Sequence, residues 1–92
     1  MKSYNWNIEK NNILKKTRNI SFEEIVLAIS EHKIMEIYNH PNQEKYPGQK
    51  IYEIEYNDYI FLVPYVETET EYFLKTIIPS RKATKKHKNK KQ

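Results

Sequence analysis

The chain has 92 residues, which is enough for one small domain and too few for two. Hydrophobic residues make up 38% and aromatic residues 13%, so we expect one modest core rather than wholesale disorder. The chain has no cysteine, which excludes disulfide scaffolds, cysteine-ligated zinc sites and thiol nucleophiles. Because no apolar run approaches the roughly 20 residues that span a bilayer, we expect a cytoplasmic protein without a membrane partner.

Positive charge is concentrated at the C-terminus. Residues 81–92 contain Arg81 and six lysines with no acid, and because the whole chain has a net charge of +4, residues 1–80 carry −3. Such a block attracts nucleic acid by neutralising phosphates, although charge alone fits a solvated tail that aids solubility equally well. We expect a single domain over residues 1–84 and a flexible basic tail over residues 85–92.

The first part of the chain predicts two helices. Asn7 is placed to cap a helix that runs to about Lys16. Ser21 and Glu24 form a capping box for a second helix. Apolar side chains then recur at helical spacing: Phe22, Ile25, Val26 and Ile29. This pattern predicts an amphipathic helix over residues 21–31.

After residue 33 the apolar pattern changes to a period of two. It predicts four strands, over residues 34–38, 50–56, 59–63 and 72–78. Asn57 and Asp58 form a turn, and Pro64 indicates a bulge or an edge at the end of the third strand. Ser80 is placed to cap a short final helix. We therefore predict an α+β fold in which two N-terminal helices pack on a four-stranded antiparallel sheet, followed by a short C-terminal helix and the basic tail.

The residue types exclude several kinds of catalysis. His32, His40 and His87 lack metal-ligand spacing, so we interpret each as a surface residue. A chain with one glycine does not form a glycine-rich phosphate loop. Glu53 and Glu55 lie on one strand face and are interpreted as solvent-facing positions. We therefore expect neither a metal nor a cofactor.

Cleavage of RNA through its own 2′-hydroxyl needs none of these groups. It needs a group that removes the hydroxyl proton, a cation that stabilises the phosphorane and a proton donor for the leaving 5′-oxygen. Arg81 is the candidate cation, and Lys75 or Tyr65 is the candidate for proton transfer if its pKa is lowered towards neutrality. A structural interpretation of the same three residues is also open, with Tyr65 as an aromatic side chain at the edge of the core and Lys75 and Arg81 as surface charges. The candidate RNA-binding lysines are Lys50, Lys82, Lys85 and Lys86.

Two segments resemble the BrnT-like toxins. Residues 6–11 (WNIEKN) followed by residues 20–24 (ISFEE) are similar to the opening of that family, and residues 77–84 (IIPSRKAT) are similar to its close. The resemblance implies a ribonuclease toxin of a type II toxin–antitoxin pair, with a RelE-like fold and a partner antitoxin that carries a DNA-binding domain. Arg18 and Tyr65 stand at or near positions where many members have histidine, which directs proton transfer away from histidine.

The leading hypothesis is therefore an endoribonuclease toxin that cleaves mRNA without a metal, with RNA as its substrate and an antitoxin as its partner. A second hypothesis is a non-catalytic module that docks nucleic acid or an acidic protein on the same basic surface. A third is an inhibitor or adaptor that uses the RelE-like surface only to bind a protein. Cleavage of RNA in the presence of EDTA separates the first hypothesis from the other two.

Overall fold

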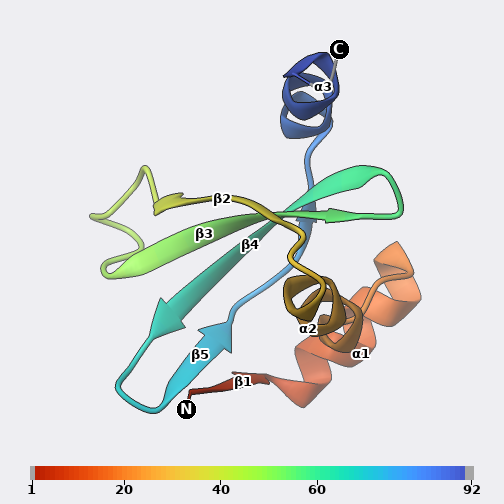
Figure 1. Cartoon of the computed structure of the whole chain (residues 1–92). Helices are drawn as coiled ribbons and strands as arrows, with labels where there is room; N and C mark the ends of the chain where they lie inside the picture. The colour runs from red at the N-terminus through yellow and green to blue at the C-terminus, as the bar shows by residue number, and fades with distance from the viewer. Residues whose placement is uncertain (1, 91–92) are drawn as a thin grey trace.

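The fold comes from a computed structural model that describes residues 2–90, within which there are six strands and three helices; Figure 1 shows their arrangement. In chain order the elements are β1 (Ser3–Trp6), α1 (Ile8–Arg18), α2 (Phe22–Ser30), β2 (Ile34–Asn39), β3 (Gln49–Tyr56), β4 (Tyr59–Glu67), β5 (Glu71–Leu74), β6 (Ile78–Pro79) and α3 (Arg81–Lys90). No helix in this range is long and apolar enough to cross a membrane.

The sheet differs from the prediction. Its order is β1-β5-β4-β3-β2, β6 pairs with β4, and β1 runs parallel to β5 while the other pairs are antiparallel. The predicted RelE-like arrangement of two helices on a four-stranded antiparallel sheet is therefore wrong, because the sheet has six strands and is mixed. β1 was missed because four alternating residues give a weak periodic signal and its partner lies at the other end of the chain.

The strand predicted over residues 72–78 is also two separate strands, β5 and β6. Both pair with β4, at Tyr65–Glu67 and at Phe61–Leu62 respectively. Pro64 lies between these two pairings, so its missing N–H falls where β4 changes partner. The carbonyl of Pro64 is still satisfied, because it accepts a 2.8 Å hydrogen bond from the backbone of Lys75. β4 therefore continues through the proline instead of ending there.

Both predicted N-terminal helices are present, and their caps are as expected. The Asn7 side chain accepts from the backbone N–H of Lys10 at 2.9 Å, and Ser21 and Glu24 make both bonds of the capping box. The two helices are tied together by Asn11, a buried residue whose Oδ1 accepts from the backbone of Phe22 at 2.8 Å. This bond fixes the angle at which α2 leaves α1.

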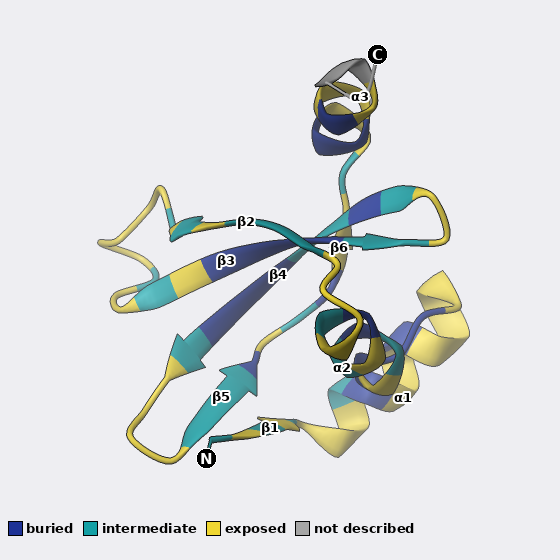
Figure 2. Ribbon diagram, in the orientation of Figure 1, coloured by how far each residue is buried: buried dark blue, intermediate teal, exposed yellow. Residues whose placement is uncertain are grey.

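The apolar core lies between these two helices and one face of the sheet, and Figure 2 shows the middle of β3 and β4 coloured as buried. The fully enclosed members of the core include Leu14, Phe22, Ile25, Ile54, Val63, Leu74 and Ile77. Tyrosine side chains also belong to this core. The rings of Tyr52 and Tyr65 stack there with their centres 4.0 Å apart. We call this the core face of the sheet.

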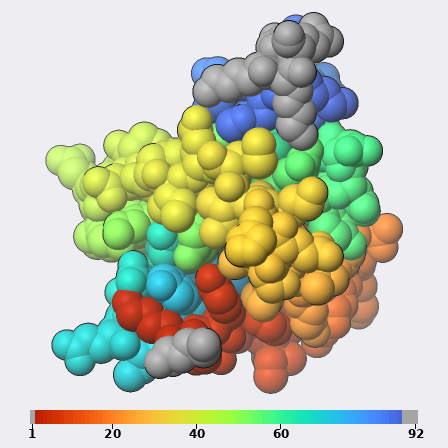
Figure 3. Space-filling view, viewed as in Figure 1, coloured from red at the N-terminus to blue at the C-terminus, as the bar shows by residue number. Residues whose placement is uncertain are grey.

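α3 packs against the opposite face. It runs from Arg81 to Lys90, so residues 85–90 of the predicted tail are helical, and residues 91–92 lie outside the described residues. In the space-filling view α3 sits against β2 and the β3–β4 hairpin (Figure 3). We call this second face of the sheet the α3 face.

Candidate active site

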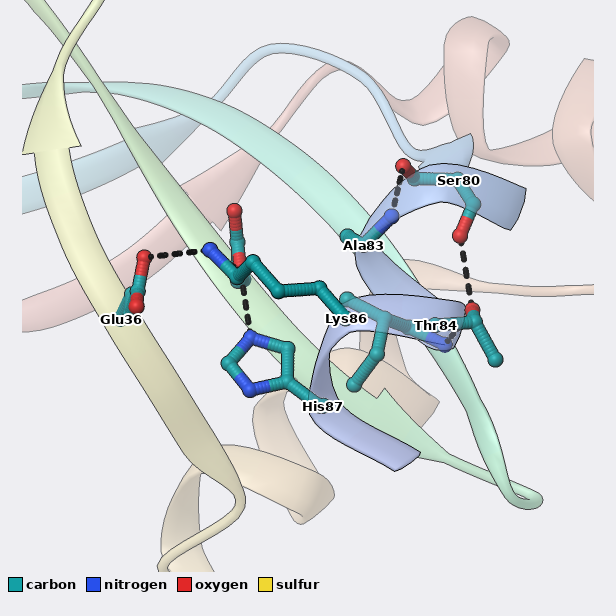
Figure 4. Close-up of polar contacts among 8 residues, drawn as sticks. Glu36, Ser80, Ala83, Thr84, Lys86 and His87 are labelled. Atoms are coloured by element: carbon teal, nitrogen blue, oxygen red, sulfur yellow. Dashed lines mark hydrogen bonds and ion pairs between the residues drawn. The ribbon is translucent and has the colours of Figure 1, made fainter. Parts of the chain in front are cut away.

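α3 is held to the sheet mainly by polar contacts near its first turn. Ser80 caps the helix by accepting from the backbone of Ala83 at 3.1 Å, and its own backbone N–H donates to the carbonyl of Ile60 at 2.9 Å. The Thr84 hydroxyl accepts from the backbone of Ile60 at 2.8 Å and donates to the carbonyl of Ser80 at 2.7 Å (Figure 4). Ala83, Thr84 and His87 form the buried stripe of the helix.

His87 makes the deepest of these contacts. Its Nε2 lies 2.7 Å from Oε1 of Glu53, and the two residues are only 6% and 4% exposed. The expectation that both would be surface residues is therefore wrong. Glu53 stands in β3 between two core residues, Tyr52 and Ile54, and because side chains alternate along a strand it points to the α3 face. The helix buries what the strand pattern alone would leave in solvent.

Two further side chains contact the Glu53 carboxylate. Lys86 Nζ lies 3.7 Å from Oε1 of Glu53 and 3.1 Å from Oε2 of Glu36 on β2. Burial, the hydrogen bond to Glu53 and the nearby negative charges raise the pKa of Tyr38 from 10 to about 12. The hydrogen bond to Glu36 raises the pKa of Lys86 above its ordinary value. At neutral pH the pocket therefore contains an intact phenol and a fixed ammonium group.

These residues border a pocket of about 250 Å³ between α3 and the sheet. Its lining consists of Tyr38, Glu53, Leu62, Ser80, Lys82, Ala83 and Lys86. Lys82 is exposed at its rim and has no ion-pair partner among the side chains described over residues 2–88. A carboxylate, a phenol and two cations therefore converge on a space that is open to an anionic ligand.

The same cluster contains the one group of His, Asp and Glu side chains, among the described residues, whose ligand atoms are close enough together to hold a metal ion. Ligand atoms of Glu36, Glu53 and His87 lie within 4.8 Å of one another. The ammonium group of Lys86 contacts both carboxylates, so the positive charge that balances them comes from a lysine.

The three predicted catalytic residues do not converge. Arg81 is exposed in the first turn of α3, beside the Ile60 end of β4, whereas the backbone of Lys75 is hydrogen-bonded to Pro64, four positions further along β4 and next to Tyr65. Four residues of strand separate these two points by roughly 13 Å. Tyr65 is 3% exposed and points into the core, and burial raises the pKa of its hydroxyl, away from the value that proton transfer requires.

The four predicted RNA-binding lysines are also divided. Lys82 and Lys86 line the pocket, and Lys85 is exposed on α3 outside it. Lys50 pairs with the core residue Tyr65 in the strand register, so it lies on the core face of the sheet and not on the α3 face. Its Nζ is 3.8 Å from Glu67. Sequence reasoning found the cations of the pocket but missed its acids, because their burial depends on the docking of α3.

No family model matches this chain, and neither the curated proteins nor the solved structures include a match to it.

Proposed function

We propose that the protein is an endoribonuclease toxin of a type II toxin–antitoxin pair, with RNA as its substrate and the pocket beside α3 as its active site. The observation that carries the proposal is the buried Glu53 carboxylate, which faces a pocket lined by Tyr38, Lys82 and Lys86. The likeness of the two chain ends to the BrnT-like toxins gives additional support and is the basis for expecting a cognate antitoxin.

In the proposed reaction Glu53 removes the proton from a ribose 2′-hydroxyl. The resulting oxygen attacks the adjacent phosphorus, the bond from phosphorus to the 5′-oxygen breaks, and a 2′,3′-cyclic phosphate forms. Tyr38 gives its proton to the leaving 5′-oxygen and recovers one from Glu53 through their hydrogen bond. Lys82 and Lys86 stabilise the additional negative charge of the phosphorane.

His87 acts on this chemistry through Glu53. With Nε2 protonated, it donates to one oxygen of the carboxylate and fixes the side chain in a single orientation. His87 therefore has a positioning role, comparable to that of residues that hold a catalytic base in other acid–base sites. Its burial under α3 makes the geometry of the base depend on the docking of the helix.

The test is to incubate purified protein with RNA in EDTA and to identify the product ends. We expect cleavage with 2′,3′-cyclic phosphate and 5′-hydroxyl ends. Lys82→Ala should lower the cleavage rate at least about tenfold, because it removes one of the cations that stabilise the phosphorane. Lys85→Ala is the matched control, since Lys85 is also an exposed lysine of the same helix but lies outside the pocket.

Arg81→Ala tests the earlier assignment of the phosphate clamp in the same assay. Because Arg81 is exposed and does not line the pocket, we expect cleavage to be retained. Intact RNA with the wild-type protein would contradict the proposed function. Loss of cleavage in Arg81→Ala but not in Lys82→Ala would move the active site away from the pocket.

The second candidate function is a non-catalytic module that binds nucleic acid. It is favoured by the surface of α3 that faces away from the sheet, where the exposed cations Arg81, Lys82, Lys85 and Lys88 lie. Salt-sensitive retardation of RNA without any cleavage in EDTA is the result that this function predicts.

A further inference from the structure

The α3 face continues beyond the pocket as a row of apolar side chains. Ile51 lies two residues before Glu53 in β3, so it points to the same face of the sheet. The strand register places Tyr38 of β2 on one side of Ile51 and Pro64 of β4 on the other. Directly opposite residues share a face, so these three side chains extend from the pocket across the sheet.

The next row along the strands reaches the far side of the sheet. Val66 lies two residues after Pro64 in β4 and pairs with Phe73 of β5. We call Tyr38, Ile51, Pro64, Val66 and Phe73 the apolar strip. Tyr38, Val66 and Phe73 are half-buried, while Ile51 and Pro64 are buried between them. The rings of Tyr38 and Phe73 are thus accessible at the two ends of the apolar strip, and the buried residues Ile51 and Pro64 lie between them.

Charges are distributed unevenly along the apolar strip. Lys75 is exposed, and its Nζ lies 5.2 Å from the centre of the Phe73 ring. Lys82 and Lys86 stand at the pocket end. The nearest acid on β5 is Glu71, two residues beyond Phe73, where it accepts a 2.6 Å hydrogen bond from Asn5. Cations therefore lie at both ends of the strip, and the carboxylates at the pocket end, Glu53 and Glu36, are in contact with Lys86.

We propose that the apolar strip is a subsite for single-stranded RNA, in which a base a few nucleotides away from the cleaved bond stacks on Phe73 while Lys75 contacts its phosphate. The proposal rests on the proposed function. Phe73 lies two strands away from Glu53 across the sheet and two same-face side chains away from it along the strands. The distance is roughly 16 Å, which a few unstacked nucleotides cover. An aromatic face beside a lysine is the arrangement that holds single strands, because every base has a face to stack and every linkage a charge.

The experiment uses an eight-nucleotide DNA that carries the fluorescent base 2-aminopurine, because a strand without 2′-hydroxyls is bound but not cleaved. Binding to the wild-type protein should quench the probe when it occupies one or two positions. Phe73→Leu, which keeps an apolar side chain but removes the ring, should weaken binding about fivefold or more and abolish the quenching. Lys75→Ala should lower the salt dependence of binding by about one phosphate contact.

Tyr59→Ala and Lys16→Ala are the matched controls. Tyr59 is a half-buried aromatic residue at the opposite end of β4, and Lys16 is an exposed lysine of α1. Both should bind as the wild type does. An affinity unchanged in Phe73→Leu would overturn the subsite even if RNA is cleaved, and so would equal affinity for an oligonucleotide made of abasic sites, which shows binding by charge alone. Failure to cleave RNA in EDTA would instead overturn the proposed function, whatever the oligonucleotide affinity.

Discussion

The two faces of the sheet are formed by the same strands but bury different kinds of side chain. In β3 the consecutive residues Tyr52, Glu53 and Ile54 are 3%, 4% and 0% exposed, yet the first and third enter the apolar core and the second faces a polar pocket. α1 and α2 cover the core face with aliphatic and aromatic side chains. α3 covers the other face with a small residue, a hydroxyl and an imidazole.

The two faces therefore make different contributions to the protein: one to the stability of the fold and the other to the candidate site. Burial of apolar surface is the main stabilising term in folding, so the core face supplies most of the free energy of unfolding. Charged groups are costly to bury and persist where partners satisfy them, as Glu53 is satisfied by His87, Lys86 and Tyr38. The α3 face therefore carries the buried charged and titratable side chains, while the core face stabilises the fold that holds them in place.

The largest effect on stability is expected on the core face. Leu74 is fully buried in β5, and Leu74→Ala leaves a cavity in the centre of the core. We expect the free energy of unfolding to fall by about 2–5 kcal/mol, measured by urea denaturation. A loss below about 1 kcal/mol would show that the core face is not the main source of stability.

A smaller effect is expected where α3 joins the sheet. Thr84→Val keeps the shape of the side chain but leaves the buried N–H of Ile60 without its acceptor, which should cost about 1–3 kcal/mol. The control is Thr17→Val on α1, where the exposed hydroxyl bonds only to the carbonyl of Ile13 and little change is expected. Equal stability of the two variants would contradict the view that these polar contacts hold α3.

The third prediction concerns pH and has the smallest effect under ordinary conditions. A phenol is neutral below its pKa, and the pKa of Tyr38 rises from 10 to about 12 on folding, so the unfolded chain loses this proton first as pH increases. The stabilisation that Tyr38 contributes is complete below pH 10 and is lost between about pH 10 and pH 12. Tyr38→Phe should flatten this part of the curve of unfolding free energy against pH. An unchanged slope would show that folding does not raise the pKa of Tyr38.

Local signals in the sequence predicted much of the fold. The caps at Asn7, Ser21 and Ser80 depend on contacts within four residues, and all three are confirmed. β1 and the break between β5 and β6 could not be predicted, because a parallel pairing and a change of partner at Pro64 are decided by distant parts of the chain.

The candidate site was less predictable than the fold for the same physical reason. Glu53 alternates with apolar residues in the pattern of a solvent-facing residue, and the sequence of β3 does not indicate that a helix covers it. The available signal lay in α3, where the less polar residues Ala83, Thr84 and His87 recur at helical spacing within a basic segment. That stripe predicts a docked helix and, through it, a buried partner for the imidazole.

The central claim is that Glu53 is the base of an RNA-cleaving site, and its most direct test is the single-turnover cleavage rate of a DNA strand that contains one ribonucleotide. We expect Glu53→Gln to cleave at least about 100-fold more slowly than the wild type, because a positioned general base contributes that much. Glu55→Gln, two residues away on the same strand face and 3.9 Å from Lys33, should cleave at the wild-type rate. Equal rates for Glu53→Gln and the wild type would contradict the account.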